Sequence, residues 1–336
     1  MATIRVKSDY LTIQEAVNVA SPGDVVLVEP GMYTESVFIS NKISFTIVAD
    51  GQEVRVAPGL KDGNIVGDCF LLFKCRNVEC SGFTCSDAYP VHDRANTFEL
   101  LLNGSPSTGS IYRYEYRGRK VSGYKRKAGI HIVESNNTRI KNLYGYSCDI
   151  GLYIKSDNNV WVEDFHVRNC GESGVRIESS SNIFIENGVT HGHGVYTNSV
   201  YSRPGCGIDY CKVNVVNISN VQSYDNSIAA FRGYEGDISN PSYYLNINKN
   251  LMVHSGAPFM INSSDYYNST HIYRKNLMYN SIDPINGHYV IIGEHKRTGD
   301  KFPVRAFTFE EFERYARRLN PASIENTKLK DWPYYQ

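Results

Sequence analysis

The middle of the chain repeats residues that can move protons or bind charge, at near-regular intervals. They occupy the third or fourth position of five short segments, GIHI, GLYI, GVRI, GIDY and AAFR, and they are His131, Tyr153, Arg176, Asp209 and Arg232. Two positions after Tyr153 and Arg176 stand Lys155 and Glu178. Imidazole, phenol and amine groups transfer protons, and guanidinium groups bind carboxylates. Gathered in one place, these residues would suit acid–base chemistry on an acidic substrate.

One reaction that would use such residues is β-elimination on a uronic acid. A cation must neutralise the C6 carboxylate, a base must remove the C5 proton, and an acid must protonate the leaving oxygen. Lys155, Arg176 and Arg232 are candidates for the cation or the base, and Tyr153 and His131 for the base or the acid. Nearby cations would lower the pKa of a tyrosine or lysine from its ordinary value of about 10.

The two carboxylates of the set, Glu178 and Asp209, leave three alternatives open. They could hold Ca²⁺ through their oxygens, or serve as the carboxylate pair of a glycoside hydrolase. They could also form ion pairs with Arg176. For the whole set, the alternative to a functional site is a solvated sheet face with mixed charges and no function.

A repeat of about 22 residues must position these side chains. Gly129, Gly151 and Gly174 are separated by 22 and 23 residues, and Gly207 follows after 33. Within each repeat, apolar and polar residues alternate over short runs bounded by Asn, Ser, Asp and Gly, which indicates short strands. Such repeats stack as coils of a parallel β-helix, where neighbouring coils lie about 4.8 Å apart. The candidate residues would then form one ladder on an outward sheet face.

Two amphipathic helices are predicted to cap the solenoid. TIQEAVNVA, from Thr12, and TFEEFERYARRL, from Thr308, both combine capping-box spacing with an apolar face. The sequence therefore predicts an all-β fold, a single-stranded parallel β-helix with N-terminal and C-terminal capping helices.

We expect a single domain over 1–336. It would comprise an N-terminal cap with the first coils, β-helix coils interrupted by a long insertion loop, and a C-terminal cap with the second helix. The expected bounds are 1–58 for the first part, 59–285 for the coils, 86–127 for the insertion and 286–336 for the last part.

The insertion ends in IYRYEYRGRKVSGYKRK, where tyrosines alternate with Lys and Arg. Rings can stack on sugars and guanidinium groups can bind their carboxylates or sulfates. Tyr116, Arg117 and Arg119 are therefore candidates for substrate binding, as is the turn histidine His193. The alternatives for this loop are a solvated hairpin or a single-stranded nucleic-acid contact.

The composition excludes some classes of partner. Lys+Arg and Asp+Glu are both 35, so there is no net charge for wholesale binding to nucleic acid or a membrane surface. No long apolar run and no signal peptide are visible. The compartment stays open: secreted with the leader removed, cytoplasmic or part of a virion. The eight cysteines form no CxxC pair and are expected to be free and buried.

The segment TIQEAVNVASPGDVVLVEPGMYTESVFI, residues 12–39, resembles the opening of proteins in the pectin-lyase-like, right-handed parallel β-helix superfamily. The resemblance implies the fold over most of the chain. In similar lyases an Arg or Lys on this face acts as the base, often with bound Ca²⁺ as the neutralising cation. The superfamily also contains hydrolases, epimerases, methylesterases and phage tailspikes, so the fold alone does not set the function.

Taken together, the residues and the resemblance predict a polysaccharide lyase that acts on an anionic, uronate-containing polysaccharide. Ca²⁺ is the one cofactor that the resemblance implies, at Glu178 and Asp209. One alternative is a glycoside hydrolase or uronan C5-epimerase at the same place. Another is a non-catalytic glycan-binding or structural protein of a phage or spore surface. A monomer is expected, or a trimer if the protein is a tailspike.

Overall fold

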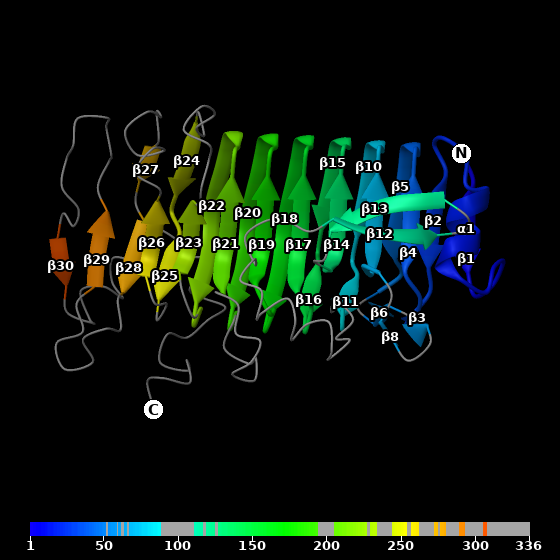
Figure 1. Cartoon of the computed structure of the whole chain (residues 1–336), viewed down its shortest axis with the longest axis horizontal. Coiled ribbons are helices and arrows are strands. Elements are labelled where there is room, and N and C mark those ends of the chain that lie inside the picture. The colour runs from blue at the N-terminus through cyan, green and yellow to red at the C-terminus, as the bar shows by residue number, and fades with distance from the viewer. Residues whose placement is uncertain are drawn as a thin grey trace.

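The computed structural model describes much of the chain, and the longest continuous run that it describes is 127–193. The described residues are 1–51, 53–58, 60–61, 64–65, 67–88, 111–116, 119–124, 127–193, 205–226, 229–233, 244–253, 257–261, 272–274, 276–279, 289–292 and 305–307. Within them the chain forms 30 strands and one α-helix. Strands of successive coils lie side by side along the long axis, from β1 at the N-terminal end to β30 (Figure 1).

An eight-stranded sheet forms one wall of the solenoid. Its strands follow the order β26-β23-β21-β19-β17-β14-β9-β4, and every neighbouring pair is parallel. The strands are β4 (Val37–Ser40), β9 (Phe70–Phe73), β14 (Ala128–Val133), β17 (Ile150–Lys155), β19 (Ser173–Glu178), β21 (Cys206–Cys211), β23 (Ala229–Gly233) and β26 (Ala257–Ile261).

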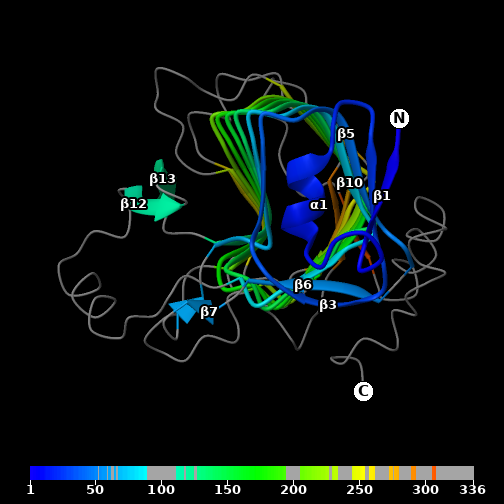
Figure 2. The same cartoon turned by 90° about the vertical axis from the view of Figure 1, so that its right-hand side faces the viewer.

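The other walls belong to one 18-stranded sheet that bends around the solenoid (Figure 2). Its first strands are β1 (Thr3–Val6), β2 (Val25–Val28), β3 (Gly31–Thr34), β5 (Ile43–Ala49), β6 (Val54–Ala57), β10 (Arg76–Ser81), β11 (Thr84–Ser86), β15 (Asn136–Lys141) and β16 (Tyr144–Tyr146). The next are β18 (Asn158–Arg168), β20 (Ser181–His191), β22 (Asn214–Tyr224), β24 (Leu245–Asn248), β25 (Leu251–Val253), β27 (Ile272–Arg274) and β28 (Asn276–Tyr279). Antiparallel strands β29 (Tyr289–Ile292) and β30 (Arg305–Phe307) follow.

Single residues in the left-handed backbone region turn the chain from one wall to the next. The long strands β18, β20 and β22 each contain two such residues, one near the start and one in the middle. Those in the middle are Asp164, Asn187 and Asn220, with φ near +55°. Asn and Asp tolerate this conformation better than other non-glycine residues. The amide of Asn220 also donates to the Asn187 side chain of the preceding coil at 2.7 Å. This contact links two consecutive coils at the turn.

The interior is one apolar cluster that runs the length of the described coils. On the eight-stranded sheet, alternate residues point inward; Ile130, Leu152, Val175 and Ile208 are fully or almost fully buried. Burying each such side chain contributes about 1.5–3 kcal/mol. All eight cysteines are free and buried, as expected from the sequence. Because inward residues are fixed by this core, the residues between them are committed to the outer face.

The first coils are covered by helix α1 (Ile13–Val19), which packs against β1, β2 and β4. Thr12 and Glu15 form the predicted capping box, and Ile13, Ala16 and Val17 are buried. Figure 2 shows α1 between the walls at this end of the solenoid. The predicted second helix, from Thr308, lies outside the described residues, so the pair of caps and the domain boundaries stay predictions.

Part of the predicted insertion loop is a hairpin rather than irregular chain. Strands β12 (Ile111–Tyr116) and β13 (Arg119–Tyr124) pair in antiparallel register, and Figure 2 places them outside the wall formed by the eight-stranded sheet. A shorter hairpin joins β7 (Leu60–Lys61) to β8 (Asn64–Ile65). Within the part of the chain that the structure describes, no helix has the length and apolarity needed to cross a bilayer.

Candidate functional site

The predicted ladder is present on the outer face of the eight-stranded sheet. Strand register pairs His131 with Tyr153 and Tyr153 with Arg176. It then pairs Arg176 with Asp209 and Asp209 with Arg232. The five side chains thus lie on five consecutive strands of the sheet, from β14 to β23, although they are far apart in the sequence. In the adjacent column Lys155 pairs with Glu178, as predicted. We call these seven residues the polar row.

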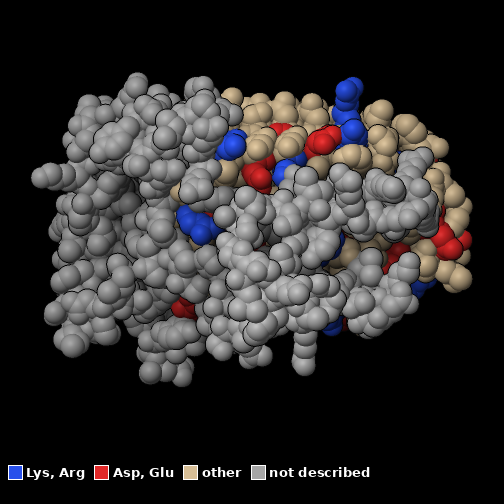
Figure 3. Space-filling model, in the orientation of Figure 1, with Lys and Arg blue, Asp and Glu red and all other residues tan. Residues whose placement is uncertain are grey.

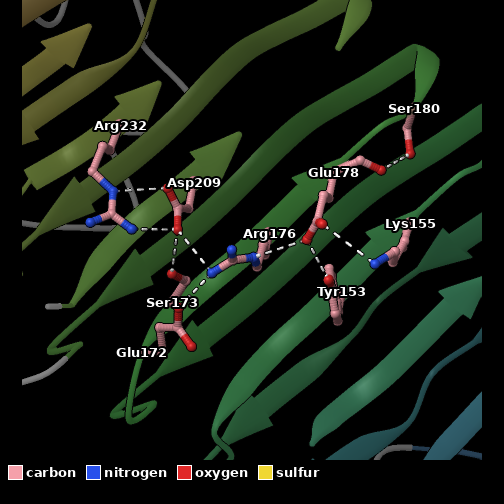
Figure 4. Close-up of polar contacts among 9 residues, drawn as sticks. All are labelled: Tyr153, Lys155, Glu172, Ser173, Arg176, Glu178, Ser180, Asp209 and Arg232. Carbon is pink, nitrogen blue, oxygen red and sulfur yellow. Dashed lines mark hydrogen bonds and ion pairs between the residues drawn. The ribbon is translucent and has the colours of Figure 1, made fainter. Parts of the chain in front are cut away.

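The centre of the polar row is Glu178, which binds three neighbours (Figure 4). The Tyr153 hydroxyl donates a hydrogen bond to Glu178 Oε2 at 2.5 Å. Lys155 Nζ lies 3.4 Å from Oε1, and Arg176 Nε lies 3.7 Å from Oε2. Burial acts to raise the pKa of Glu178, but the Tyr153 hydrogen bond and the two positive charges outweigh it and lower the pKa. Glu178 is therefore an ionised acceptor at neutral pH.

Arg176 and Asp209 extend the row as a buried ion network. An Arg176 terminal nitrogen lies 2.5 Å from Glu172 Oε1 and 3.5 Å from Asp209 Oδ2. Arg232 donates two hydrogen bonds to the Asp209 carboxylate, from Nε to Oδ1 at 3.0 Å and from a terminal nitrogen to Oδ2 at 2.7 Å. Burial raises the pKa of Asp209, and the two guanidinium groups counter part of that rise. Arg176, Asp209 and Arg232 follow one another on neighbouring strands, so positive and negative side chains alternate across the sheet and balance each other locally.

His131 has a partner that the sequence did not reveal. Asp68, just before β9, accepts a hydrogen bond from the Ala128 amide at 2.7 Å, and its other oxygen lies 3.3 Å from His131 Nδ1. Burial acts to raise the pKa of Asp68, but its contact with His131 and the hydrogen bond from the Ala128 amide help to lower it. The His131 ring stacks on Tyr153 with centroids 4.6 Å apart. Its Nε2 is buried and has no hydrogen-bond partner.

That arrangement resembles the way in which a carboxylate orients a catalytic imidazole. A carboxylate at Nδ1 favours the tautomer with the proton on Nδ1, which leaves the lone pair on Nε2. No sequence signal pointed to Asp68, because it stands 63 residues before His131 and the insertion separates their coils. Only the stacking of β9 on β14 brings the two together.

The polar row is mostly covered. Side-chain exposure is 23% for Glu178, 15% for Arg232 and 11% for Lys155, and it is 3% for Arg176 and 0% for Asp209. Tyr153 is also fully buried. The part of the row that a ligand can reach in this structure is thus Lys155, Glu178 and Arg232.

Of the remaining predicted residues, His193 is the one whose side chain the structure describes, and it does not join the row. His193 is fully buried; its Nδ1 accepts from the Cys170 amide at 3.1 Å, and its Nε2 lies 2.7 Å from Thr190 Oγ1. It therefore belongs to the interior, and its assignment to substrate binding is withdrawn. Tyr116 and Arg119 pair across the β12–β13 hairpin, where the backbone alone is described. Arg117 lies outside the described residues.

The residues predicted to hold calcium do not fit that ion. Glu178 and Asp209 are separated by Arg176, and each already contacts two cationic side chains, which would repel Ca²⁺. Among the described residues, no group of three His, Cys, Asp or Glu side chains could hold a metal ion. Of the alternatives for these two carboxylates, ion pairing with Arg176 is the one present in the structure.

Charged side chains on the rest of this face are mixed in sign. Figure 3 shows Lys and Arg interspersed with Asp and Glu over the described surface. The described part of this face therefore offers no single-sign field for steering a polyanion. Among the described residues, recognition of an acidic ligand would depend on individual cations.

No protein-family model matches the sequence, and no curated protein matches it. Similar solved structures exist. A pectin methylesterase variant in complex with a hexasaccharide is 13% identical, with a TM-score of 0.52 over 82% of this chain and 88% of that one. DFA-IIIase from Arthrobacter chlorophenolicus A6, in complex with DFA-III, is 13% identical, with a TM-score of 0.50 over 80% and 65%.

A third similar structure is the enzymatically active domain of tailspike protein 2 from bacteriophage CBA120. It is 13% identical, with a TM-score of 0.50 over 83% of this chain and 43% of that chain, so the match spans less than half of the tailspike domain. At such identities a likeness shows the fold and not the activity. The comparisons confirm the fold that the resemblance of residues 12–39 implied, a right-handed parallel β-helix.

Proposed function

We propose that this protein is a carbohydrate-active enzyme that cleaves an anionic, uronate-containing polysaccharide by β-elimination. The observation that carries the proposal is the dyad of Asp68 and His131, stacked on Tyr153 at one end of a row of cations. An oriented imidazole, a phenol and fixed cations on one sheet face are the groups that this reaction requires.

The cations would bind the C6 carboxylate of the substrate. Lys155 and Arg232 are the partly exposed cations of the polar row. Binding there places positive charge where negative charge develops as the C5 proton leaves, which lowers the barrier. Arg176 lies within 4 Å of three carboxylates and is buried, so its role is to hold Glu178 and Asp209 in place.

His131 is the proposed base, through Nε2. Because this nitrogen and Tyr153 are both buried in this structure, they must become accessible before a substrate can react there. The C5–H electron pair forms the C4–C5 double bond, the bond from C4 to the bridging oxygen breaks, and that oxygen takes a proton from Tyr153. The Tyr153 hydroxyl currently donates to Glu178, so its proton lies in a hydrogen bond to an ionised group. This assignment differs from the Arg or Lys base that the resemblance implies, because Arg176 is engaged by carboxylates.

The fold supports a carbohydrate substrate. Two of the similar structures contain a bound carbohydrate by their descriptions, a hexasaccharide and DFA-III. These are statements about those proteins, and fold alone hosts many activities. The proposal therefore rests on the residues of the polar row, with the fold as a second line of support.

A glycan screen tests the proposal. Alginate, pectate and glycosaminoglycans are each incubated with the protein, and the ultraviolet absorbance of unsaturated uronates is followed. A lyase yields that absorbance together with new chain ends. New reducing ends without the absorbance would instead establish a hydrolase and overturn β-elimination.

A uronan C5-epimerase is the second candidate, because it shares the first step. An imidazole with a free Nε2 can remove the C5 proton without any subsequent cleavage. Exchange of solvent deuterium into C5 with no loss of chain length would identify this reaction. The same experiment with His131→Gln separates catalysed exchange from background.

A further inference from the structure

A second cluster of aromatic and basic residues, which we call the Arg168 cluster, lies on another wall of the solenoid. Tyr146, Arg168, His191 and Tyr224 occupy one register column across β16, β18, β20 and β22, and Tyr144 and His166 lie beside it. All four are half-buried side chains on the outer face. They belong to the 18-stranded sheet, so they are not part of the polar row.

Arg168 is the residue of this cluster whose charge has no counter-ion among the residues that the structure describes. Its guanidinium carbon lies 5.6 Å from the ring centres of both Tyr144 and Tyr146. Its Nε is buried with no hydrogen-bond partner, and Arg168 has no ion pair within the described part of the chain. A buried donor on a charged group that lacks an acceptor costs about 1–3 kcal/mol or more, so an acceptor bound here would be stabilised.

Arg55, on the same wall, shows the paired alternative. Its guanidinium also lies over a tyrosine, 5.3 Å from the Tyr146 ring centre. However, Arg55 forms an ion pair with Asp87 at 2.7 Å and donates from Nε to Ser86 at 2.8 Å. Both arginines lie beside the Tyr146 ring. Arg55 has a carboxylate partner, whereas Arg168 has none among the described residues.

The surroundings of Arg168 do not neutralise it. His166 Nε2 and His191 Nε2 are 3.1 Å apart, so one ring donates to the other. Burial, together with the charge of Arg168, lowers the pKa of each histidine to about 4, with the neighbouring ring adding to the effect at His191. Both imidazoles are thus neutral near pH 7. His191 also stacks on Tyr224, with centroids 4.5 Å apart.

We propose that Arg168, with Tyr144 and Tyr146, is a binding site for the carboxylate of an acidic polysaccharide, separate from the polar row. The unpaired guanidinium supplies the charge and the fork of donors that a carboxylate accepts. The rings of the two tyrosines pack against the guanidinium and restrain it, and their hydroxyl groups can bond the hydroxyls of a sugar. A metal ion is disfavoured at this site because Arg168 repels it.

The ligand class of this site rests on the proposed function, whereas the site itself does not. A chain held by its carboxylates on this wall would be anchored outside the place where it is cleaved. Such anchoring affects long substrates and leaves the turnover of short ones unchanged. Sulfate is the other oxyanion that a guanidinium fork accepts, so the probes must include both groups.

The test is a binding measurement on the full chain by calorimetry. The probes are long oligogalacturonate, a heparin fragment and a neutral oligosaccharide of similar length. Arg168→Gln is expected to weaken oligogalacturonate binding about tenfold or more, which is the size of one charge-assisted hydrogen bond. Arg168→Lys, which keeps the charge and loses the fork, should lie between. Binding of the neutral chain should not change.

Arg139→Gln is the matched control. Arg139 lies on β15, with its guanidinium 6.0 Å from the Trp161 ring centre, and it is ion-paired with Glu163 at 3.6 Å. Its replacement should leave oligogalacturonate affinity unchanged. Equal affinity of the wild type and a folded Arg168→Gln, or an equal loss in both arginine variants, would overturn the proposal. Loss confined to heparin would assign the site to sulfate instead and overturn the carboxylate assignment.

The outcome separates this site from the proposed function. If the protein binds oligogalacturonate through Arg168 but releases no unsaturated product, the binding site is supported and the lyase proposal is rejected. If the protein cleaves the polymer and its binding does not depend on Arg168, the lyase proposal is supported and the binding site is rejected. If circular dichroism shows that Arg168→Gln does not fold, Arg168→Lys becomes the test variant. Oligogalacturonate affinity equal to that of the wild type would then reject binding of a carboxylate by the guanidinium fork.

Discussion

The polar row and the Arg168 cluster are both ladders on outer sheet faces, yet they treat charge differently. In the row, Arg176 and Arg232 each meet a carboxylate within 3.5 Å, and Asp209 is shared between them. In the cluster, Arg168 meets two tyrosine rings and no carboxylate among the described residues. A solenoid can therefore use the same stacking to balance charge internally or to leave it for a ligand.

The largest difference between the two regions should appear when one charge is removed from the row. Asp209→Asn leaves the buried Arg176 and the partly exposed Arg232 without their shared carboxylate, and we expect a loss of about 3–5 kcal/mol in the free energy of unfolding. Urea denaturation measures it. Asp87→Asn is the control, since its ion pair with Arg55 is 36% and 43% exposed and should contribute less than about 1 kcal/mol. Equal losses would contradict the comparison.

Activity should respond next, and separately from stability. Tyr153→Phe removes the hydroxyl that donates to Glu178 and keeps the ring that stacks on His131. We expect kcat on the polysaccharide identified by the screen to fall about 100-fold or more, with a stability loss of about 1–2 kcal/mol. Steady-state kinetics and urea denaturation of the same preparation give both numbers. Undiminished kcat in a folded Tyr153→Phe would remove Tyr153 from the reaction.

The Arg168 cluster should make the protein sensitive to acid. The pKa of His166 and of His191 is about 4 in the folded chain, against about 6.5 in an unfolded one. The unfolded chain thus binds more protons between these values, and stability is lost as pH falls from about 6.5 to 4.

A double variant measures this contribution. His166→Gln with His191→Gln should reduce the loss of unfolding free energy between pH 7 and pH 4 by about 2 kcal/mol, allowing for the partial exposure of the rings. Urea denaturation at the two pH values is the measurement. A pH dependence that matches the wild type would show that the two imidazoles titrate normally and would weaken the picture of a neutral pair beside Arg168.

The smallest expected effect concerns the exposed end of the row. Lys155 is 11% exposed and lies 3.4 Å from Glu178, which also has Arg176 and Tyr153 as partners. Lys155→Met should cost about 1 kcal/mol of stability, because Glu178 keeps its other two contacts. It should raise KM for an acidic substrate more than it lowers kcat. An unchanged KM would show that Lys155 does not bind the substrate carboxylate.

The sequence predicted the ladder because two periodicities coincide in it. The 22-residue spacing defined the coils, and strict alternation defined which of Tyr153 and Leu152 points outward. The sequence did not predict that the row is covered, because the alternation of apolar and polar residues indicates which way a side chain points and not how exposed it is. His193 was misplaced for a related reason: it follows the last strand of its coil, where alternation no longer specifies direction.

Asp68 and Arg168 illustrate two other kinds of miss. Asp68 could not be predicted, because its coil is separated from that of His131 by the insertion. The Arg168 column did carry a signal: Tyr146, Arg168, His191 and Tyr224 are spaced by 22, 23 and 33 residues, the same steps as the repeat glycines. What the spacing could not give is that Arg168 lacks a carboxylate, which depends on the residues of neighbouring coils.

We propose that His131, oriented by Asp68, removes a proton from C5 of a uronate on the eight-stranded sheet. The decisive measurement is the initial rate of unsaturated uronate formation for wild type, His131→Gln and Asp68→Asn, with folding checked by circular dichroism. We expect a fall of about 100-fold or more for His131→Gln and a smaller fall with an altered pH profile for Asp68→Asn. A folded His131→Gln that forms product at the wild-type rate would contradict it.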